Sequence, residues 1–312
     1  MEYSNRRTAI IVNPRSGHGK ALDLLNQLRE RYPGEMAGVE VRLTSHPGHG
    51  TSLAYQIVEE GFDRLVVCGG DGTWSEVANG IFTPEGRPLN PDLVVSFLPG
   101  GSGSDLLRSR PFSEDSSPLK TALMGTKVFA SDILRVRWKD LEGKNHFRIA
   151  LNSVSAGISG FVASARPIGL PLLPPRFGYL ASFLRHLWDF PPLPVTLSAS
   201  GQLLFRGDLL NLFVCNGSYS GGGMRWSPDA RLDDGFADLL LVEPVRWIRI
   251  PAYVPLLFKG RIHRIPEARS FRSDSVQAEF GHAACFEMDG EVFRGVALTI
   301  EVVPKALRVL AG

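Results

Sequence analysis

Residues 65–80 read LVVCGGDGTWSEVANG, an apolar run that passes through a glycine-rich turn into a pattern typical of a helix. Glycines at 69, 70 and 72 allow a ligand to approach the main chain, and the start of the helix offers unpaired N–H donors to an anion. Asp71 would repel a phosphate unless a cation lay between them, or unless its carboxylate accepted hydrogen bonds from nucleotide hydroxyls. The stretch therefore predicts a strand, turn and helix that bind a nucleotide and its metal; the alternative is a tight turn without a ligand.

The sequence around this stretch alternates between strand and helix patterns. Strands are expected at 8–12, 39–43, 64–68 and 93–98, and helices at 20–31, at 51–60 and after Thr73. Strands separated by amphipathic helices form a parallel sheet covered on both faces. We therefore expect a Rossmann-like, three-layer α/β/α domain over residues 1–130 that binds a nucleotide.

Two further turns follow strands of this sheet. Residues 13–20, NPRSGHGK, resemble part of a Walker A loop, but Pro14 replaces the first glycine and Ala21 the magnesium-binding hydroxyl, so this is not a P-loop. Its backbone N–H groups can still contact a ligand, and Asn13 could brace the neighbouring turn. Residues 99–105, PGGSGSD, form the second turn. Because ligands gather at the carboxyl ends of parallel strands, the three turns are expected to line one cleft.

The pattern changes near residue 131 to short β-type runs. They lie at 132–138, 146–151, 195–200, 210–215, 237–242 and 297–302, with one helix expected at 179–188. This spacing predicts an all-β second domain, an antiparallel β-sandwich over 131–304. Residues 305–312 are candidates for completing the first domain.

Two acidic motifs lie in this second part. Asp289 and Glu291 flank Gly290, and such a pair can supply a general base whose pKa is raised by its neighbour; a hairpin turn with solvated acids is the alternative that these residues alone favour. Asp234, in RLDDGF at 231–236, could hold magnesium or calcium together with carbonyl oxygens, or could simply belong to a turn.

Composition narrows the classes of protein. The 312 residues favour two domains, and 34 Lys and Arg nearly balance 32 Asp and Glu, so the net charge does not argue for nucleic acid as a partner. Cys68, Cys215 and Cys285 lie in or beside apolar runs, which favours reduced thiols and a reducing compartment. Residues 1–7 do not read as a secretory signal, and no apolar run reaches membrane-spanning length. The expected location is cytoplasmic.

Two apolar stretches, 168–194 and 245–265, are candidates for a lipid-facing surface. The second carries five cations and no acid among them: Arg246, Arg249, Lys259, Arg261 and Arg264. Cations interleaved with aromatic residues suit an anionic membrane interface, which would place the protein peripherally at the inner membrane face. Core elements with arginines at their rim are an equally weighted alternative.

Six elements occur in order along the chain: Asn13-Pro14-x-Ser16-Gly17, Gly69-Gly70-Asp71-Gly72-Thr73-x-x-Glu76-Val77, Pro99 to Asp105, Gly221-Gly222-Gly223 through Pro228, Asp234-Gly235 and Asp289-Gly290-Glu291. The ordered set resembles the diacylglycerol kinase catalytic family, especially its soluble bacterial lipid kinases. The Gly-Gly-Asp-Gly element alone is less specific, because NAD kinases share it. The resemblance implies an ATP-binding α/β domain, a C-terminal β-sandwich and an active site between them.

By position, the resemblance implies a role for each matched residue. Glu291 would accept the proton, although Asp289 could share or take that role, and Asp105 would orient the acceptor or the metal. Asp234 would bind a structural Mg2+ with the carbonyl groups of Arg231 and Phe236. The residues expected to bind ATP are Asn13, Ser16, Gly17, Thr44, Gly69, Gly70, Asp71, Gly72, Thr73, Glu76, Gly101 and Ser102.

The implied reaction is transfer of the γ-phosphate of Mg-ATP to a lipid hydroxyl at the membrane surface, first of all diacylglycerol to phosphatidic acid. Many relatives carry Thr and Asn where this chain has Ser102 and Ser104, and sphingosine kinases carry Gly-Ser-Gly there, so a sphingoid base or another lipid alcohol is an alternative acceptor. An NAD kinase-like enzyme and a non-catalytic lipid or nucleotide sensor are more distant alternatives. The sequence leaves the oligomeric state open, with a dimer as one option.

Overall fold

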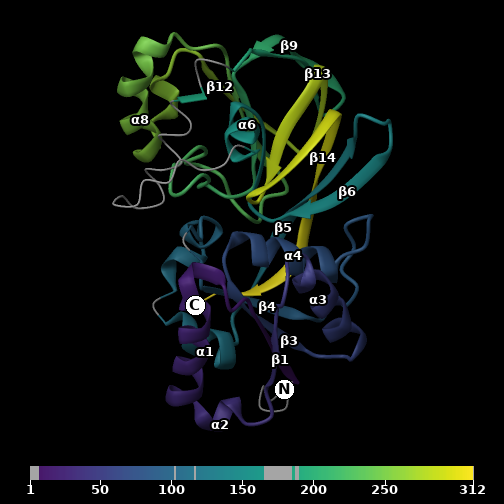
Figure 1. Cartoon of the computed structure of the whole chain (residues 1–312), viewed down its shortest axis with the longest axis vertical. Coiled ribbons are helices and arrows are strands. Elements are labelled where there is room, and N and C mark those ends of the chain that lie inside the picture. The colour runs from purple at the N-terminus through teal and green to yellow at the C-terminus, as the bar shows by residue number, and fades with distance from the viewer. Residues whose placement is uncertain (1–6, 102, 116, 165–184, 187–189, 312) are drawn as a thin grey trace.

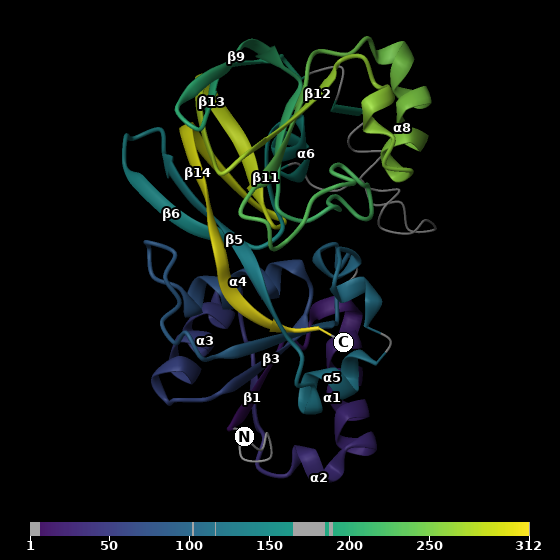
Figure 2. The same ribbon diagram turned by 180° about the vertical axis from the view of Figure 1, so that it is seen from behind.

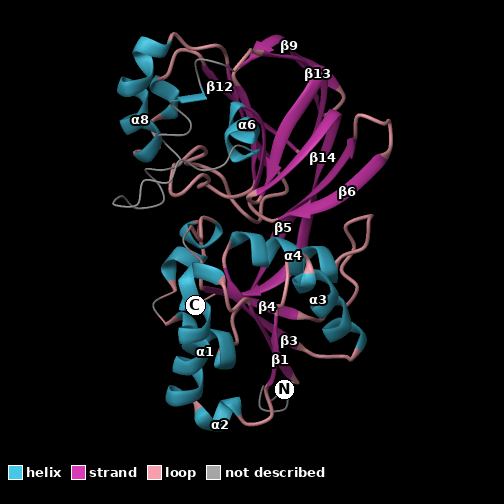
Figure 3. Cartoon of the chain, in the orientation of Figure 1, coloured by secondary structure: helices cyan, strands magenta, loops and turns pink. Residues whose placement is uncertain are grey.

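The computed structural model describes residues 7–101, 103–115, 117–164, 185–186 and 190–311. The chain forms two halves stacked along its long axis (Figure 1). One half has helices on both sides of a parallel sheet, and the other consists mainly of antiparallel strands (Figure 3).

Four parallel strands form the sheet of the α/β half in the order β4-β3-β1-β2. Ile10 in β1 pairs with Val66 on one side and with Val41 on the other, so β1 lies inside the sheet. Every residue of β3 is buried, as its apolar sequence predicts. The bounds are β1 Thr8–Val12, β2 Glu40–Leu43, β3 Arg64–Gly69 and β4 Val94–Pro99.

Successive residues of β1 face different helix layers, because side chains alternate along a strand. Ile10 shares a buried cluster with Leu25 of α1, whereas Ile11 shares another with Ile57 of α3 and Val77 of α4. The helices are α1 Lys20–Arg31, α2 Pro33–Met36, α3 His49–Glu59, α4 Asp71–Ile81 and α5 Pro118–Met124. The predicted three-layer arrangement is therefore confirmed.

The second half surrounds an apolar core that includes Leu197, Phe286 and Ile300. Its central strands follow the order β12-β11-β10-β7-β13-β14, while β8 pairs with β13 and β9, and β6 pairs with β5. The bounds are β5 Val128–Lys139, β6 Asn145–Ala150, β7 Ser153–Gly157, α6 Ile158–Ser164, β8 Leu193–Ala199, β9 Gln202–Leu209, β10 Asn211–Cys215, β11 Ala237–Val242, α8 Ile250–Phe258, β12 Ala268–Ser273, β13 Ser275–Met288 and β14 Glu291–Leu310. The antiparallel β-sandwich is present as predicted.

The long strand β14 passes through both halves (Figure 2). Its first residues pair with β13 in the sandwich, and Val309 pairs in parallel with Val95 of β4. The strand β5 accompanies it, with a break in register between Val303 and Leu307. The two sheets are thus continuous, and this connection holds the turns of the α/β half opposite the β13–β14 hairpin.

Several elements differ from the sequence prediction. The strands β7, β9, β12 and β13 were not expected, and the strand expected at 297–302 is the middle of the much longer β14. The helix expected at 179–188 lies outside the described residues except for 185–186, which are helical. Within the described ranges, no helix has the length and apolar character needed to cross a bilayer.

Candidate active site

Three turns, after β1, β3 and β4, pack directly against one another. A Cβ added at Gly101 would lie 2.4 Å from the Cα of Gly70, and one at Gly17 would lie 2.3 Å from the carbonyl oxygen of Gly100. A larger residue would force the turns apart, so close approach explains these glycines. The predicted convergence of the three turns is confirmed.

Asn13 braces the first of these turns against the second. Its Nδ2 donates to Thr73 Oγ1 over 3.0 Å, and its Oδ1 accepts the N–H of Arg15 over 3.1 Å. Gly69 lies directly beneath Thr73, because an added Cβ would approach the Thr73 Cβ to 2.5 Å. The brace expected from the sequence is therefore present, and it fixes the hydroxyl of Thr73 at the start of α4.

A cleft of about 590 Å³ lies between these turns and the start of β14. A Cβ added at Gly72 would meet nothing within 4 Å, although glycine in a helix costs about 1 kcal/mol relative to alanine. Packing therefore does not explain Gly72, whereas open space for a ligand does. The cleft is lined by Asn13, Ser16, Pro47, Gly48, Thr51, Gly70, Gly72, Thr73, Glu76, Arg148, Glu291, Val292 and Phe293.

Not every expected nucleotide-binding residue lines this cleft. Gly17, Gly69 and Gly101 are used in the packing of the turns, and Ser102 lies outside the described residues. Thr44, at the end of β2, is 9% exposed and its N–H donates to the Val12 carbonyl oxygen over 2.9 Å. Gly17, Gly69, Gly101 and Thr44 therefore support the cleft from behind.

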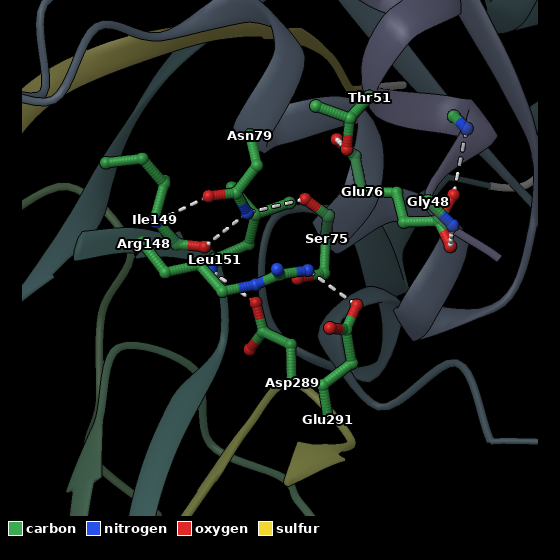
Figure 4. Close-up of polar contacts among 11 residues, drawn as sticks. Gly48, Thr51, Ser75, Glu76, Asn79, Arg148, Ile149, Leu151, Asp289 and Glu291 are labelled. Atoms are coloured by element: carbon green, nitrogen blue, oxygen red, sulfur yellow. Dashed lines mark hydrogen bonds and ion pairs between the residues drawn. The ribbon is translucent and has the colours of Figure 1, made fainter. Parts of the chain in front are cut away.

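Glu76 holds the start of α3 at the edge of the cleft (Figure 4). Its two carboxylate oxygens accept the N–H groups of Gly48 over 2.8 Å and Gly50 over 2.9 Å. Thr51 Oγ1 also donates to the Glu76 carbonyl oxygen over 2.8 Å. A carboxylate is favourable at a helix N-terminus, so Glu76 positions α3 in addition to lining the cleft.

Asp71 is the acidic residue at the first turn of α4. Its Oδ2 accepts the N–H of Ser104 over 2.8 Å, whereas its buried Oδ1 has no hydrogen-bond partner among the described residues. Burial raises the pKa of Asp71 to about 6, and the nearby carboxylates of Asp105 and Asp289 also raise it. A hydroxyl donor or a metal ion would satisfy the free oxygen, which fits a nucleotide that binds with its metal.

Asp105 joins the turn after β4 to the second half of the chain. Its Oδ2 accepts the N–H of Gly222 over 2.7 Å, and Arg108 Nε lies 3.3 Å from its Oδ1. The residue is 6% exposed, and burial raises its pKa. Asp105 therefore ties the triple-glycine loop at 221–223 to the nucleotide side of the molecule.

Asp289 occupies the hairpin between β13 and β14 with a positive φ of 48°. Its Oδ2 accepts the N–H of Leu151 over 2.6 Å (Figure 4). Its Oδ1 accepts the N–H groups of Asn152 and Ser153, each over 3.0 Å. The residue is 7% exposed, and burial raises its pKa. With both oxygens occupied by backbone donors, Asp289 organises the turn between β6 and β7 and is poorly placed to accept a proton.

Glu291, two residues further on, faces the cleft from the other side. Arg148 Nη2 donates to its Oε1 over 2.6 Å, and the Glu291 side chain is 34% exposed (Figure 4). Burial raises its pKa, Arg148 lowers it, and the carboxylates of Glu76 and Asp289 raise it. Glu291 thus presents a carboxylate to the same space that Gly72 leaves open.

Asn79 and Arg148 belong to this site but were missed by sequence reasoning. Asn79 Nδ2 donates to the Ile149 carbonyl oxygen and its Oδ1 accepts the Ile149 N–H, each over 2.9 Å. These bonds fasten α4 to β6, beside the hairpin that carries Glu291. The partners are 70 and 143 residues apart in sequence, so no local spacing could have indicated them.

In the loop at 231–236, where a structural metal ion is expected, an arginine side chain lies beside Asp234. Asp234 Oδ2 is ion-paired with Arg272, and its Oδ1 accepts the N–H of Phe236 over 3.1 Å. The Arg272 guanidinium also lies 5.2 Å from the Phe236 ring centroid and 3.0 Å from Asp238. Across the described residues, no group of three or more His, Cys, Asp or Glu could hold a metal. The Mg2+ site expected from Asp234 and the carbonyl groups of Arg231 and Phe236 stays a prediction, and Arg272 is the side-chain cation beside Asp234 in the structure.

A Mg2+ ion bound at this site would stabilise the folded chain, so its removal with EDTA is expected to lower the Tm of the nucleotide-free protein. Arg272→Ala should also lower the free energy of unfolding, by about 1 kcal/mol, because Asp234 and Asp238 lose their half-exposed cation. Thermal scans with and without EDTA measure the first effect, and urea unfolding measures the second. Arg269→Ala, which removes a neighbouring surface ion pair with Glu243, is the matched control. A wild-type Tm that neither falls with EDTA nor rises on adding Mg2+ without nucleotide would contradict the expected Mg2+ site.

Comparison with known proteins identifies the protein family to which the two halves of the chain are similar. Residues 7–136 match the diacylglycerol kinase catalytic domain, and residues 152–311 match the YegS C-terminal NAD kinase beta sandwich-like domain. The chain is 25% identical to a candidate lipid kinase, YtlR, of Bacillus subtilis, over 96% of this chain and 97% of that protein. It is also 25% identical to a diacylglycerol kinase of Staphylococcus carnosus, over 92% and 89%.

Solved structures show the same fold. A crystal structure of a candidate diacylglycerol kinase from Bacillus anthracis matches with a TM-score of 0.78 at 20% identity, covering 100% of this chain and 97% of that one. An NAD kinase from Archaeoglobus fulgidus, solved with ATP, matches with a TM-score of 0.52 at 17% identity, covering 97% and 93%. The fold and the two domain matches define a kinase. The chain belongs to the diacylglycerol kinase-like family of lipid kinases.

Proposed function

We propose that this chain transfers the γ-phosphate of Mg-ATP to the hydroxyl of a lipid, with diacylglycerol as the first acceptor to test and phosphatidic acid as its product. The observation that carries the proposal is the cleft in which Gly72 leaves open space between Thr73 and the carboxylate of Glu291. A donor phosphate and an acceptor hydroxyl could meet there.

The α/β half supplies the nucleotide side of this cleft. Backbone N–H groups at the start of α4 and at the turn after β1 provide donors for phosphate oxygens. Ser16 and Thr73 add hydroxyl groups at the cleft wall. The free Oδ1 of Asp71 would accept a nucleotide hydroxyl or contact the metal ion.

Mg2+, when bound with ATP, would neutralise charge on the phosphates. Asp71 and Asp105 are the carboxylates of this chain that would hold it, because both are buried beside the turns and lack a full set of donors. Most of the catalysis would then come from positioning and charge neutralisation.

Glu291 is the side chain we assign to proton acceptance from the lipid hydroxyl. It faces the cleft, and burial raises its pKa toward the range useful to a general base. Its ion pair with Arg148 fixes the direction of the carboxylate. Asp289 supports this arrangement by holding the turn between β6 and β7.

The acceptor is identified by an assay with purified acceptors in mixed micelles. Dioctanoylglycerol, sphingosine and NAD are each offered with Mg-ATP, and product formation is measured for each. Phosphorylation of dioctanoylglycerol supports the proposed reaction, and phosphorylation of sphingosine alone would move the acceptor to sphingoid bases. Turnover of NAD alone would replace the proposal with an NAD kinase, and no turnover at all would favour a sensor.

We also propose that α8 and its flanks contact an anionic membrane. Ile248 and Phe258 are 66% and 41% exposed, although they are large apolar residues. Five exposed cations lie along the same segment: Arg246, Arg249, Lys259, Arg261 and Arg264. Exposed apolar side chains bordered by cations suit insertion at an anionic lipid surface.

Charge reversal of Arg261 and Arg264 to Glu is expected to weaken binding to phosphatidylglycerol vesicles by at least about 2 kcal/mol, since each cation near the surface contributes about 1 kcal/mol. Vesicle sedimentation measures the effect. The matched control reverses Arg29 and Arg31, which are exposed on α1 in the other half. Equal loss of binding in the two double variants would show that α8 is not the contacting face.

A further inference from the structure

Arg148 is the only positively charged side chain among the described residues that line the nucleotide cleft. The other two charged side chains in that lining, Glu76 and Glu291, are acids. Asp71 adds a further carboxylate at the start of α4, with one buried oxygen that has no hydrogen-bond partner in the described part of the chain. Because phosphates and carboxylates repel one another, a triphosphate that binds among these acids depends on positive charge.

Packing between the two halves of the chain fixes the position of Arg148. The residue lies on β6, and the next residue, Ile149, exchanges two hydrogen bonds with Asn79 of α4, each over 2.9 Å (Figure 4). The same helix carries Gly72 and Thr73 in its first turn, where the cleft opens. The strand that carries Arg148 is therefore fastened to the helix that borders the nucleotide.

The guanidinium of Arg148 has donors to spare. Its Nη2 donates to Glu291 Oε1 over 2.6 Å, whereas its Nε is buried and has no hydrogen-bond partner among the described residues. The Cζ atom lies 5.4 Å from the ring centroid of Phe293, which also lines the cleft. An arginine has five N–H donors, and a buried donor without an acceptor is unfavourable. An acceptor oxygen supplied by a ligand in the cleft would satisfy it.

We propose that Arg148 donates hydrogen bonds to the γ-phosphate of the nucleotide and is a catalytic residue together with Glu291. This inference rests on the proposed kinase function and names the side chain that contacts the transferred group. Glu291 takes the proton of the lipid hydroxyl, whose oxygen forms a bond to the γ-phosphorus. The bond from that phosphorus to the β–γ bridging oxygen breaks, and ADP leaves. Arg148 stabilises the negative charge on the non-bridging oxygens during this step.

The ion pair of Arg148 with Glu291 suits both partners to this reaction. A phosphate that accepts from the free donors of Arg148 lies close to the carboxylate that deprotonates the hydroxyl, because one guanidinium contacts both. The positive charge between them reduces the repulsion between carboxylate and phosphate. It also lowers the pKa of Glu291, which keeps the base deprotonated.

Nucleotide binding without lipid tests the contact with the γ-phosphate. Adenylyl imidodiphosphate and ADP, each with Mg2+, are titrated into the protein in a calorimeter. Arg148→Gln is expected to raise the Kd of the imido analogue at least about tenfold, the scale of one hydrogen bond between charged groups, and to leave the Kd of ADP within twofold. The ADP measurement also shows that the nucleotide site of the variant is intact.

Two further variants sharpen the comparison. Arg148→Lys should recover part of the lost affinity, because it keeps the charge but lacks the planar fork of donors. Arg137→Gln, on the neighbouring strand β5, is the matched control, since it breaks an ion pair with Glu301 outside the cleft. An affinity of Arg148→Gln for the imido analogue within twofold of the wild type, or an equal loss of affinity for ADP, would overturn the contact.

Steady-state kinetics test the catalytic part of the inference. With Mg-ATP and dioctanoylglycerol, Arg148→Gln should lower kcat at least about a hundredfold, because arginines that contact the transferred phosphoryl group contribute about 10³–10⁵ in kcat. A kcat within threefold of the wild type at saturating ATP would overturn the catalytic role.

The binding and activity measurements separate this inference from the proposed function. If the wild type binds the imido analogue through Arg148 but phosphorylates no lipid, the proposed function is wrong and the contact is supported. If the wild type phosphorylates a lipid and Arg148→Gln binds the analogue as the wild type does, the contact is wrong and the proposed function stands. A wild type that binds neither nucleotide would overturn both.

Discussion

Glu291→Gln is expected to lower kcat at least about a hundredfold, the scale of lost general-base assistance. The amide keeps the size of the side chain and can still accept a hydrogen bond from Arg148, but it cannot take a proton from the lipid hydroxyl. The KM for ATP should stay close to the wild-type value, because the nucleotide is held by the turns of the α/β half. Initial rates at saturating lipid and ATP give the comparison.

Glu142→Gln, an exposed change in the turn between β5 and β6, is the control for handling and folding. A Glu291→Gln variant that keeps a kcat within threefold of the wild type would place the proton acceptor elsewhere. Asp289 and Glu287 would then be the carboxylates to replace next.

Asp289→Ala is expected to lower the free energy of unfolding by about 3 kcal/mol. The change leaves the N–H groups of Leu151, Asn152 and Ser153 without their acceptor, and each unpaired buried donor costs about 1–3 kcal/mol. Release of the buried negative charge, whose pKa is raised, offsets part of this cost. Equilibrium unfolding in urea measures the difference.

Asp289→Asn should cost less than Asp289→Ala, because asparagine tolerates the positive φ at this position and keeps one acceptor oxygen. Asp92→Ala, whose side chain is 91% exposed, is the control and should change stability by less than about 0.5 kcal/mol. Equal stability of Asp289→Ala and the control would show that the three hydrogen bonds contribute little.

The α/β half was predictable because its signals are local. Apolar runs such as 64–68 mark buried strands, glycines mark the turns that follow, and the order of strands and helices selects a parallel sheet. The convergence of the three turns follows from that topology. The close approach of Gly70 to Gly101 needed the structure.

The long strand β14 was only partly predictable, because Pro304 and Lys305 break its strand pattern. In the structure they lie where the pairing with β5 is interrupted, and Lys305 has a positive φ of 53°. A proline is tolerated at such a bulge since no ladder hydrogen bond is required of its nitrogen. The tendency of proline to end a strand therefore predicts that the strand stops before Pro304. In the structure, pairing with β5 resumes at Leu307 and continues to Leu310.

The roles of the acidic residues were the least predictable part of the site. Sequence spacing suggested that Asp289 and Glu291 form a pair, but the donors that occupy Asp289 lie more than a hundred residues earlier, in the turn between β6 and β7. The cation beside Asp234 is likewise distant in sequence, at Arg272.

The most direct test of lipid kinase activity is incubation of the full-length protein with γ-labelled ATP, Mg2+ and a total lipid extract, followed by partition into chloroform. The proposed function predicts label in a chloroform-soluble phospholipid, whose identification names the acceptor, and no such label with Glu291→Gln. Label that stays wholly in the aqueous phase with the wild-type protein would contradict the claim that this chain phosphorylates a lipid.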